Sequence, residues 1–313
     1  MKIKVGLFAL AICGLLFAGS KAAAQGLGTS ARQISPGSLR LLAYYQGAAS
    51  QDVNFRISQG QSCAAGPANP NGVAFPCGQA GDVEASGRGG ALLLKAVYQP
   101  WESFQYYAFG GAGEYSLSVP STTIRNLLTG DRPGMILGAG LKAVLYPETL
   151  VTPAIAVDVS MARHRYYFNR RHPGGTPGAN NNIEQRLDLM QYQVAVQGSR
   201  IFRVKDPEFQ IEPYGGIKWV RTQSDLKDLT DGSHAGGGQD RVHPFVGVRI
   251  PVYKRETFFA EAAFVGVYQY AAGMEVRFGG SEGRSRTVVP VREDGANQPP
   301  QGKMNEAEQE TKN

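Results

Sequence analysis

The sequence has few cysteines and few long apolar runs. Only three cysteines occur in 313 residues, and Cys13 lies in the apolar N-terminal segment, which leaves Cys63 and Cys77 for the body of the chain. Beyond residue 24 no apolar run reaches the roughly 18 residues that a membrane-spanning helix needs. Helices and closed barrels are the only structures that satisfy every backbone group in lipid. The body of the chain therefore either crosses no membrane or crosses as a barrel.

The sequence also lacks common signatures of catalytic sites. It has no H-E-x-x-H motif and no phosphate-binding glycine loop. Asp158, Ser160 and His164 fall on one side of an alternating segment. In a strand, however, Ser160 and His164 would be about 13 Å apart, too far for a nucleophile–base hydrogen bond. We predict no catalytic residue, no metal and no cofactor, and keep a hydrolase at the rim of a barrel as the third functional alternative.

The N-terminus predicts export. Lys2 and Lys4 precede an apolar run at 5–18, and an A-x-A cleavage site ends at Ala24, so residues 1–24 are predicted to be a secretory signal peptide. Its removal takes away three lysines and no acid, which lowers the formal charge from +6 to +3. Because the remaining basic residues are scattered and the chain is exported, we predict no nucleic-acid partner.

The segment 268–278 alternates between two kinds of residue. One side carries Tyr268, Tyr270, Ala272, Met274, Val276 and Phe278. A strand places successive side chains on opposite faces, so this face is apolar while the other carries charge. The aromatic residues lie at both ends of the apolar face, which is typical of a strand that crosses lipid between two aromatic girdles. We therefore predict that this face contacts lipid.

Alternation elsewhere predicts an all-β fold of about ten strands. The predicted strands are 38–58, 86–99, 104–119, 134–147, 153–168, 186–202, 208–223, 241–253, 257–267 and 268–278. Four connections are short, at 100–103, 148–152, 203–207 and 254–256, and four are long and polar, at 59–85, 121–133, 169–185 and 224–240. Short turns inside and long loops outside are typical of outer-membrane barrels. The short connection near Val267 departs from this pattern, so eight or twelve strands remain alternatives.

The stretch 258–278, FFAEAAFVGVYQYAAGMEVRF, resembles the closing hairpin of small Gram-negative outer-membrane β-barrel proteins, the OmpA-like transmembrane class. In that class the final strand ends in an aromatic residue that the insertion machinery reads. The resemblance implies an up-and-down antiparallel transmembrane barrel over 38–278 in the bacterial outer membrane. It also implies an insertion signal made of Tyr270, Met274, Val276 and Phe278. In the class the aromatic residue usually ends the chain, whereas here 279–313 follow.

The segments outside the predicted barrel have their own composition. Residues 25–37 are predicted to be a linker, and 279–313, rich in Gly, Gln, Glu, Asn and Pro, a flexible periplasmic tail. A periplasmic partner for this tail is left open. Cys63 and Cys77 lie in a Gly/Pro/Asn-rich loop of an exported chain, so we predict a disulfide between them.

The face opposite the apolar one is predicted to line the lumen. Its charged residues are Arg40, Lys95, Glu114, Lys142, Asp158, Glu212, Lys218, Arg249, Glu261, Glu275 and Arg277. Near-balanced charges in a confined space are expected to form paired networks, because unpaired buried charge is costly. A barrel of eight to ten strands has little free space inside. We therefore predict a filled lumen and a structural or surface-interaction role, with a narrow porin-like channel for small solutes or ions as the alternative.

The long loops offer a surface for binding. Arg170, Arg171 and His172 lie in the predicted loop 169–185 and could contact anionic lipopolysaccharide or a host glycan. The alternative is a solvated loop tip. The partners predicted for the whole protein are outer-membrane lipid, lipopolysaccharide and the outer-membrane insertion machinery.

Overall fold

The structure is a computed structural model of the chain. It describes residues 30–32, 35–57, 81–120, 125–173, 181–204, 209–230, 232, 234–253, 255–264 and 267–279. The predicted signal peptide, the pair Cys63 and Cys77 and the tail beyond Gly279 lie outside the described residues. Within the described ranges, no helix has the length and apolar character needed to span a membrane.

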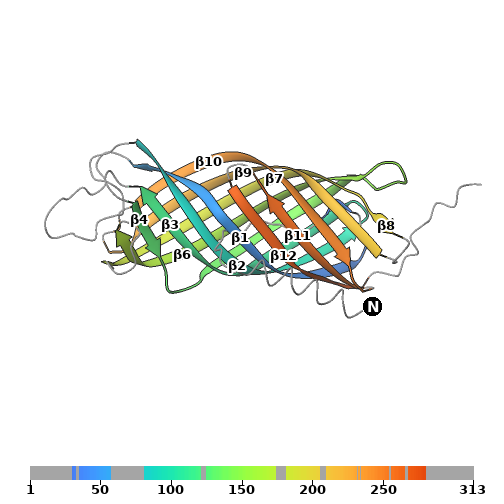
Figure 1. The fold of residues 1–313 in the computed structure, drawn as a ribbon, viewed down its shortest axis with the longest axis horizontal. Coiled ribbons are helices and arrows are strands. Elements are labelled where there is room, and N and C mark those ends of the chain that lie inside the picture. Colours follow the sequence, from blue (N-terminus) through green and yellow to red (C-terminus); the bar gives the residue numbers. More distant parts are fainter. Residues whose placement is uncertain are drawn as a thin grey trace, which may run out of the picture. The chain divides into compact units, whose positions relative to one another are not determined.

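The described residues form twelve strands that pair antiparallel. The strands are β1 (Ser38–Ile57), β2 (Gly81–Trp101), β3 (Phe104–Pro120), β4 (Arg125–Thr129), β5 (Gly134–Tyr146), β6 (Ala154–Pro173), β7 (Asn181–Ser199), β8 (Phe202–Val204), β9 (Phe209–Asp228), β10 (His234–Pro251), β11 (Glu256–Ala263) and β12 (Val267–Phe278). The last strand pairs with the first, so the sheet closes into a ring, and its tilted strands form a barrel (Figure 1). The predicted all-β antiparallel barrel is confirmed.

The ring has ten strand positions although it contains twelve strands. β4 and β5 both pair with β3 and with β6, so together they fill one position. β8 pairs only with β9 and continues the line of β7 after a break at 200–201. The two short strands β4 and β8 lie at opposite ends of the barrel (Figure 1). We call the end with the turn 102–103 the short-turn end and the opposite end the long-loop end.

Several strands extend further toward the long-loop end than the alternation predicts. β6 continues to Pro173 and β10 begins at His234, so much of the predicted loops 169–185 and 224–240 is strand, which corrects that prediction. The segment HAGGGQD at the start of β10 has no apolar face. It still satisfies its backbone groups by pairing with β9 along its whole length. The start of β10 is therefore a strand because of its backbone hydrogen bonds, although its sequence lacks the alternation of apolar and polar residues by which strands were predicted.

The ring becomes narrower toward the long-loop end. β11 and β12 have only 8 and 12 residues, whereas β1 and β10 have 20 and 18. Beyond the hairpin of β11 and β12, β1 pairs directly with β10 at Arg56 and Gly236. An ion pair of 2.7 Å between Arg241 and Asp52 also joins these two strands. The ring therefore has eight strand positions at this end, a size at which side chains fill the interior.

We predict that a side chain at Gly237 obstructs the direct contact between β1 and β10. A Cβ atom at Gly237 would overlap the carbonyl group of Asn54 and lie 2.8 Å from the Cα atom of Phe55, which are backbone atoms that cannot rotate away. Gly237→Ala should lower the free energy of unfolding by about 1–3 kcal/mol, the usual cost of overpacking. Gly238→Ala, whose Cβ would lie 3.8 Å from the nearest atom, is the matched control. Equal urea midpoints for both variants would contradict the prediction.

Candidate functional site: the barrel lumen

The outside of the barrel carries a belt of exposed apolar side chains. Leu92 and Leu94 on β2 are 65% and 67% exposed, and Ile217 on β9 and Val242 on β10 are 59% and 56% exposed. On each strand these residues alternate with buried ones, such as Leu93 and Lys95 on β2. So many exposed apolar side chains in water would be costly, whereas in lipid they are favourable.

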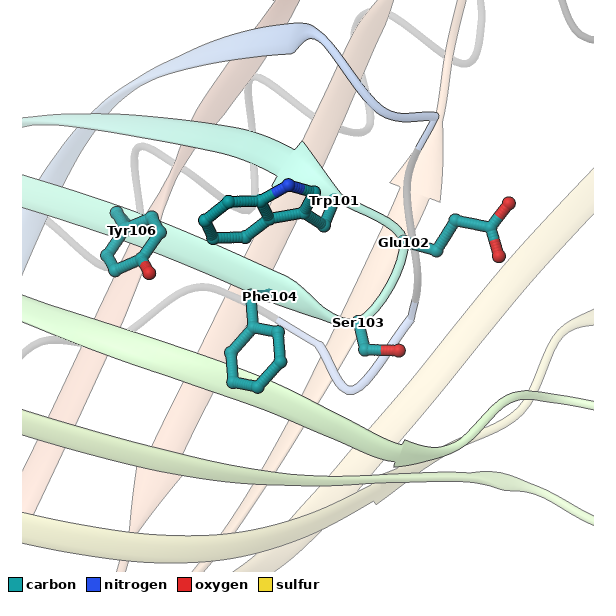
Figure 2. Close-up of a pocket in the computed structure, with 5 residues that line it drawn as sticks. All are labelled: Trp101, Glu102, Ser103, Phe104 and Tyr106. Atoms are coloured by element: carbon teal, nitrogen blue, oxygen red, sulfur yellow. The ribbon is translucent and has the colours of Figure 1, made fainter.

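Aromatic side chains lie at both edges of this belt. At the short-turn end, Trp101 packs edge-on against Phe104 and Tyr106, with ring centroids 6.4 and 6.3 Å apart. With Glu102 and Ser103 these residues line a surface pocket of about 420 Å³ (Figure 2). Toward the other end, the rings of Tyr45 and Tyr270 lie 6.4 Å apart, and Tyr268 and Trp219 are partly exposed. Such girdles are typical of barrels that span a lipid bilayer.

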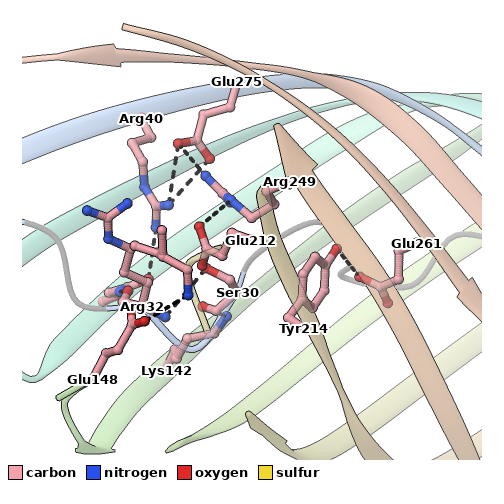
Figure 3. Close-up of polar contacts among 12 residues, drawn as sticks. Ser30, Arg32, Arg40, Lys142, Glu148, Glu212, Tyr214, Arg249, Glu261 and Glu275 are labelled. Atoms are coloured by element: carbon pink, nitrogen blue, oxygen red, sulfur yellow. Dashed lines mark hydrogen bonds and ion pairs between the residues drawn. The ribbon is translucent and has the colours of Figure 1, made fainter. Parts of the chain in front are cut away.

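Buried ion pairs occupy the lumen near the short-turn end. Arg249 donates a hydrogen bond of 2.9 Å to Glu275 and forms an ion pair of 3.6 Å with Glu212 (Figure 3). Arg40 pairs with the same Glu275 at 3.3 Å and donates a hydrogen bond of 2.9 Å to Gln105. The four charged side chains come from β9, β10, β12 and β1, which follow one another around one part of the ring with only β11 between them.

Three lysines and two acids occupy the next level of the lumen. Lys142 forms an ion pair of 3.6 Å with Asp158, and the Tyr107 hydroxyl donates a hydrogen bond of 2.5 Å to the same carboxylate. The Lys95 ammonium lies 3.9 Å from the centroid of the Tyr107 ring, a cation–π contact. Figure 3 shows a separate pair in which the Tyr214 hydroxyl donates a hydrogen bond of 2.9 Å to Glu261. The fifth charged group at this level is the buried Lys218.

Uncharged polar residues line the middle of the lumen. The buried ones include Gln46, Gln191, Gln193, Thr222, Ser224, His243 and Gln269. Within the part of the chain that the structure describes, several buried polar atoms here make no hydrogen bond, among them Gln193 Oε1, Gln269 Nε2 and Lys218 Nζ. Buried polar groups of this kind are normally satisfied by ordered water. These buried atoms therefore need hydrogen-bond partners beyond the described residues.

An apolar cluster fills the lumen at the long-loop end. We call it the apolar cap, and its buried members are Val53, Phe55, Ala85, Tyr115, Leu117, Val119, Leu128, Tyr166, Phe168, Ile183, Leu187, Leu189, Leu226 and Ala235. The rings of Tyr115 and Tyr166 stack with centroids 4.7 Å apart. The cap lies where the ring narrows to eight strands, so its side chains meet across the lumen. Sequence reasoning treated the inner face as polar throughout and missed this cap.

The segment 30–32, before the first strand, enters the lumen at the short-turn end. Ala31 is fully buried in a cluster with Val144, Ala154 and Ala156. Side chains of the barrel hold the two residues next to Ala31 by their backbone carbonyls. Lys142 Nζ donates a hydrogen bond of 3.0 Å to the Ser30 carbonyl, and Gln105 Nε2 donates one of 3.1 Å to the Arg32 carbonyl. The predicted linker 25–37 therefore contains a lumen-filling piece that its sequence did not reveal.

Nine of the eleven charged residues predicted to line the lumen are buried, and two are not. Glu114 is exposed on the outside of β3, which corrects its prediction. The reason is that both faces of β3 are rich in aromatic and small residues, so alternation alone left the inward face undecided. Arg277 is exposed near the end of β12, which also corrects its prediction, because the ring of strands ends there and encloses nothing.

The residues predicted to form an insertion signal lie on the outer face of β12. Met274 and Phe278 are 39% and 45% exposed, and Tyr270 and Val276 are partly exposed. Arg170, Arg171 and His172 are part of β6, not of a loop tip, because this strand pairs with β4 as far as Pro173. His172 Nε2 lies 3.0 Å from Thr129 Oγ1 of β4.

The three residues weighed as a hydrolytic set have other neighbours. Asp158 accepts the hydrogen bond of Tyr107 and pairs with Lys142, and His164 Nδ1 lies 3.4 Å from the Tyr166 hydroxyl. Ser160 is opposite Gly140 and Gln193 in the ladders. Among the described residues, no cluster of His, Cys, Asp and Glu has the arrangement of a metal site.

The fold and its two surfaces define the class of protein. A closed antiparallel ring with an apolar belt, aromatic edges and a filled interior with buried ion pairs is a transmembrane β-barrel of the kind found in bacterial outer membranes. The chain thus has the fold of a transmembrane β-barrel. In outer-membrane barrels the short turns are periplasmic and the long loops are outside, so we refer to the short-turn end as the periplasmic end and to the long-loop end as the outer end.

Comparison with known proteins gives similarities of fold only. No protein-family model matches the chain, and no curated protein matches it in sequence. A similar solved structure is the translocator domain of the autotransporter NalP from Neisseria meningitidis, with 13% identity, coverage of 82% of this chain and 90% of that one, and a TM-score of 0.40. Another is the outer-membrane protease OmpT from Escherichia coli, with 9% identity, coverage of 80% and 100%, and a TM-score of 0.45. A third is OprG from Pseudomonas aeruginosa, with 8% identity, coverage of 80% and 99%, and a TM-score of 0.38.

Proposed function

We propose that the protein is a non-enzymatic structural barrel whose lumen is closed at both ends and whose outer end serves surface interaction. The observation that carries this proposal is the apolar cap, which fills the lumen where the ring narrows to eight strands. Ions avoid a dry apolar constriction because they would lose their hydration there. The segment 30–32 supports the proposal at the periplasmic end.

The barrel as refolded should show no discrete openings in a planar lipid bilayer. The apolar cap and the segment 30–32 act in series, so either one alone is enough to stop a steady ion current. Single-channel recording at both voltage polarities tests this, with a known porin in the same bilayer as the positive control. Discrete openings of the unmodified protein would replace the structural role by a channel.

A narrow channel for small solutes or ions is the second candidate. It is favoured by the buried polar atoms in the middle of the lumen, such as Gln193 Oε1, that need water to satisfy them. In that case the cap and the segment 30–32 would be gates that open. A concentration gradient or a mechanical load across the bilayer would then elicit openings that are absent at rest.

Three further assignments complete the proposal. The outward-facing set Tyr270, Met274, Val276 and Phe278 is proposed as the signal that the insertion machinery reads. The tail beyond Gly279 is proposed to remain in the periplasm, where a partner could bind it. Arg170, Arg171 and His172 are proposed as a surface for anionic glycans at the outer end.

A further inference from the structure

The outer wall of the barrel carries three arginines around one carboxylate. Arg163 and Arg165 on β6 and Arg186 on β7 all form ion pairs with Asp188 on β7, with N–O distances of 3.3, 2.8 and 2.9 Å. We call these four residues the arginine cluster. Three guanidinium groups against one carboxylate leave a surplus of two positive charges at this place.

The cluster lies directly above the apolar belt. Met161, two residues below Arg163 on the same face of β6, is 50% exposed. Met161 is opposite Tyr192 of β7, which is 38% exposed and shares the outward face of Asp188. Side chains at the level of Met161 and Tyr192 contact acyl chains. The outward-facing side chains that follow toward the long-loop end are therefore at the level of the lipid headgroups.

Neighbouring charges do not cancel the surplus. On β9, Asp225 is opposite Asp188 and forms an ion pair of 3.4 Å with Lys227. Arg221 of β9 and Asp240 of β10 lie 4.0 Å apart as a second pair. Each of these two acids is matched by one base. Glu184 lies on the outward face of β7 two residues from Arg186, and counting it still leaves a surplus of one positive charge.

The geometry of the cluster suits a second anion. Arg165 and Arg186 reach Asp188 through Nε, so this carboxylate does not occupy their terminal nitrogens. The Arg163 side chain is 56% exposed. Guanidinium groups bind tetrahedral and planar oxyanions through paired N–H donors, and a phosphate offers several oxygens to such donors.

We propose that the arginine cluster binds a phosphate group of lipid A, the phosphorylated lipid part of lipopolysaccharide. The position at headgroup level beside the belt favours a membrane lipid over a soluble polyanion, because the lipid is already held at this depth. In this role Asp188 orients the three arginines and limits their mutual repulsion. The site is distinct from Arg170, Arg171 and His172, which lie further along β6.

The test uses the full mature chain, refolded in detergent, and purified lipid A with two phosphates. Replacing the cluster by R163Q/R165Q/R186Q should weaken binding of lipid A about tenfold or more, since several charge-assisted hydrogen bonds are lost. The matched control R56Q/R88Q/R132Q removes the same charge from three exposed arginines elsewhere and should change binding less than about threefold. Lipid A without phosphates should bind the unmodified protein as weakly as lipid A binds the cluster variant.

A second variant keeps the proposal testable if the triple variant does not fold. Asp188→Asn keeps the shape of the side chain and raises the surplus within the arginine cluster from two positive charges to three, so it should strengthen lipid A binding several-fold while it weakens the barrel itself. If Asp188 and the arginines were only a structural ion-pair network, D188N would weaken both. Equal losses in the cluster and control variants, or equal binding of lipid A with and without phosphates, would overturn the proposal. Tighter binding of a soluble sulfated glycan than of lipid A would also overturn it.

Discussion

A cysteine placed at Gln193 should react slowly with a small charged thiol reagent while the barrel is intact. Gln193 points into the middle of the lumen and is 7% exposed, with the apolar cap beyond it toward the outer end and the segment 30–32 toward the periplasmic end. The two native cysteines of the mature chain are replaced by serine in this experiment. Labelling is followed by mass spectrometry in vesicles that expose one end of the barrel at a time.

The apolar cap and the segment 30–32 can each be removed separately. Tyr166→Ala with Phe168→Ala takes two fully buried rings out of the apolar cap and should raise the labelling rate from the outer end at least about tenfold, because their removal opens a path through the cap for the reagent. A chain that starts at Ser35 should raise the rate from the periplasmic end only. The same two alanines at exposed Tyr146 and Phe104 are the control. Fast labelling of the unmodified barrel would contradict the proposed closed lumen.

The second large effect is expected from the ion pairs near the periplasmic end. Arg249 contacts both Glu275 and Glu212, and all three side chains are buried. Arg249→Met should lower the free energy of unfolding by about 3–5 kcal/mol, because it leaves buried carboxylates without their cation. Urea titration in lipid vesicles, read by heat-modifiable migration on a gel, measures this loss.

Two variants distinguish a lost charge from lost packing. R249M/E212Q removes one of the stranded carboxylates and should recover part of the stability that R249M loses. Arg56→Met breaks the exposed ion pair of Arg56 and Asp82, whose side chains are 77% and 66% exposed, and should leave the urea midpoint unchanged because water screens such pairs. A destabilisation of equal size in R249M and R56M would show that burial of the network is not the cause.

Several features of the fold could be predicted from the sequence because lipid imposes a simple rule on it. Every residue at belt level faces either acyl chains or the interior, so β2, β5, β6, β9 and β12 alternate visibly. This alternation also predicted the ten strand positions and the placement of the short turns at one end of the barrel. The nine buried charged residues of the lumen could be predicted because charged side chains are unfavourable on the lipid-facing side of a strand.

The strand ends and the face of β3 could not be predicted for a related reason. Above the belt the apolar side of β6 and β9 changes from the outer to the inner face, where Phe168 and Leu226 belong to the apolar cap. The start of β10 is small or polar on both faces. β3 has aromatic and small residues on both faces, so the inward position of Tyr107 and the outward position of Glu114 depended on its neighbours.

By itself, the sequence determined that the chain forms strands with one lipid-facing side, because period-two alternation is a local property that each strand carries alone. Only the tertiary structure decided which side chains meet inside the barrel. The apolar cap, the ion pair of Arg249 with Glu275 and the entry of Ala31 join residues that are far apart in the chain. The apolar cap depends on the ring narrowing from ten strands to eight, which follows from the unequal lengths of β11, β12, β1 and β10. The other two contacts depend on the closure of the ring at its ten-strand end. No single segment contains that information.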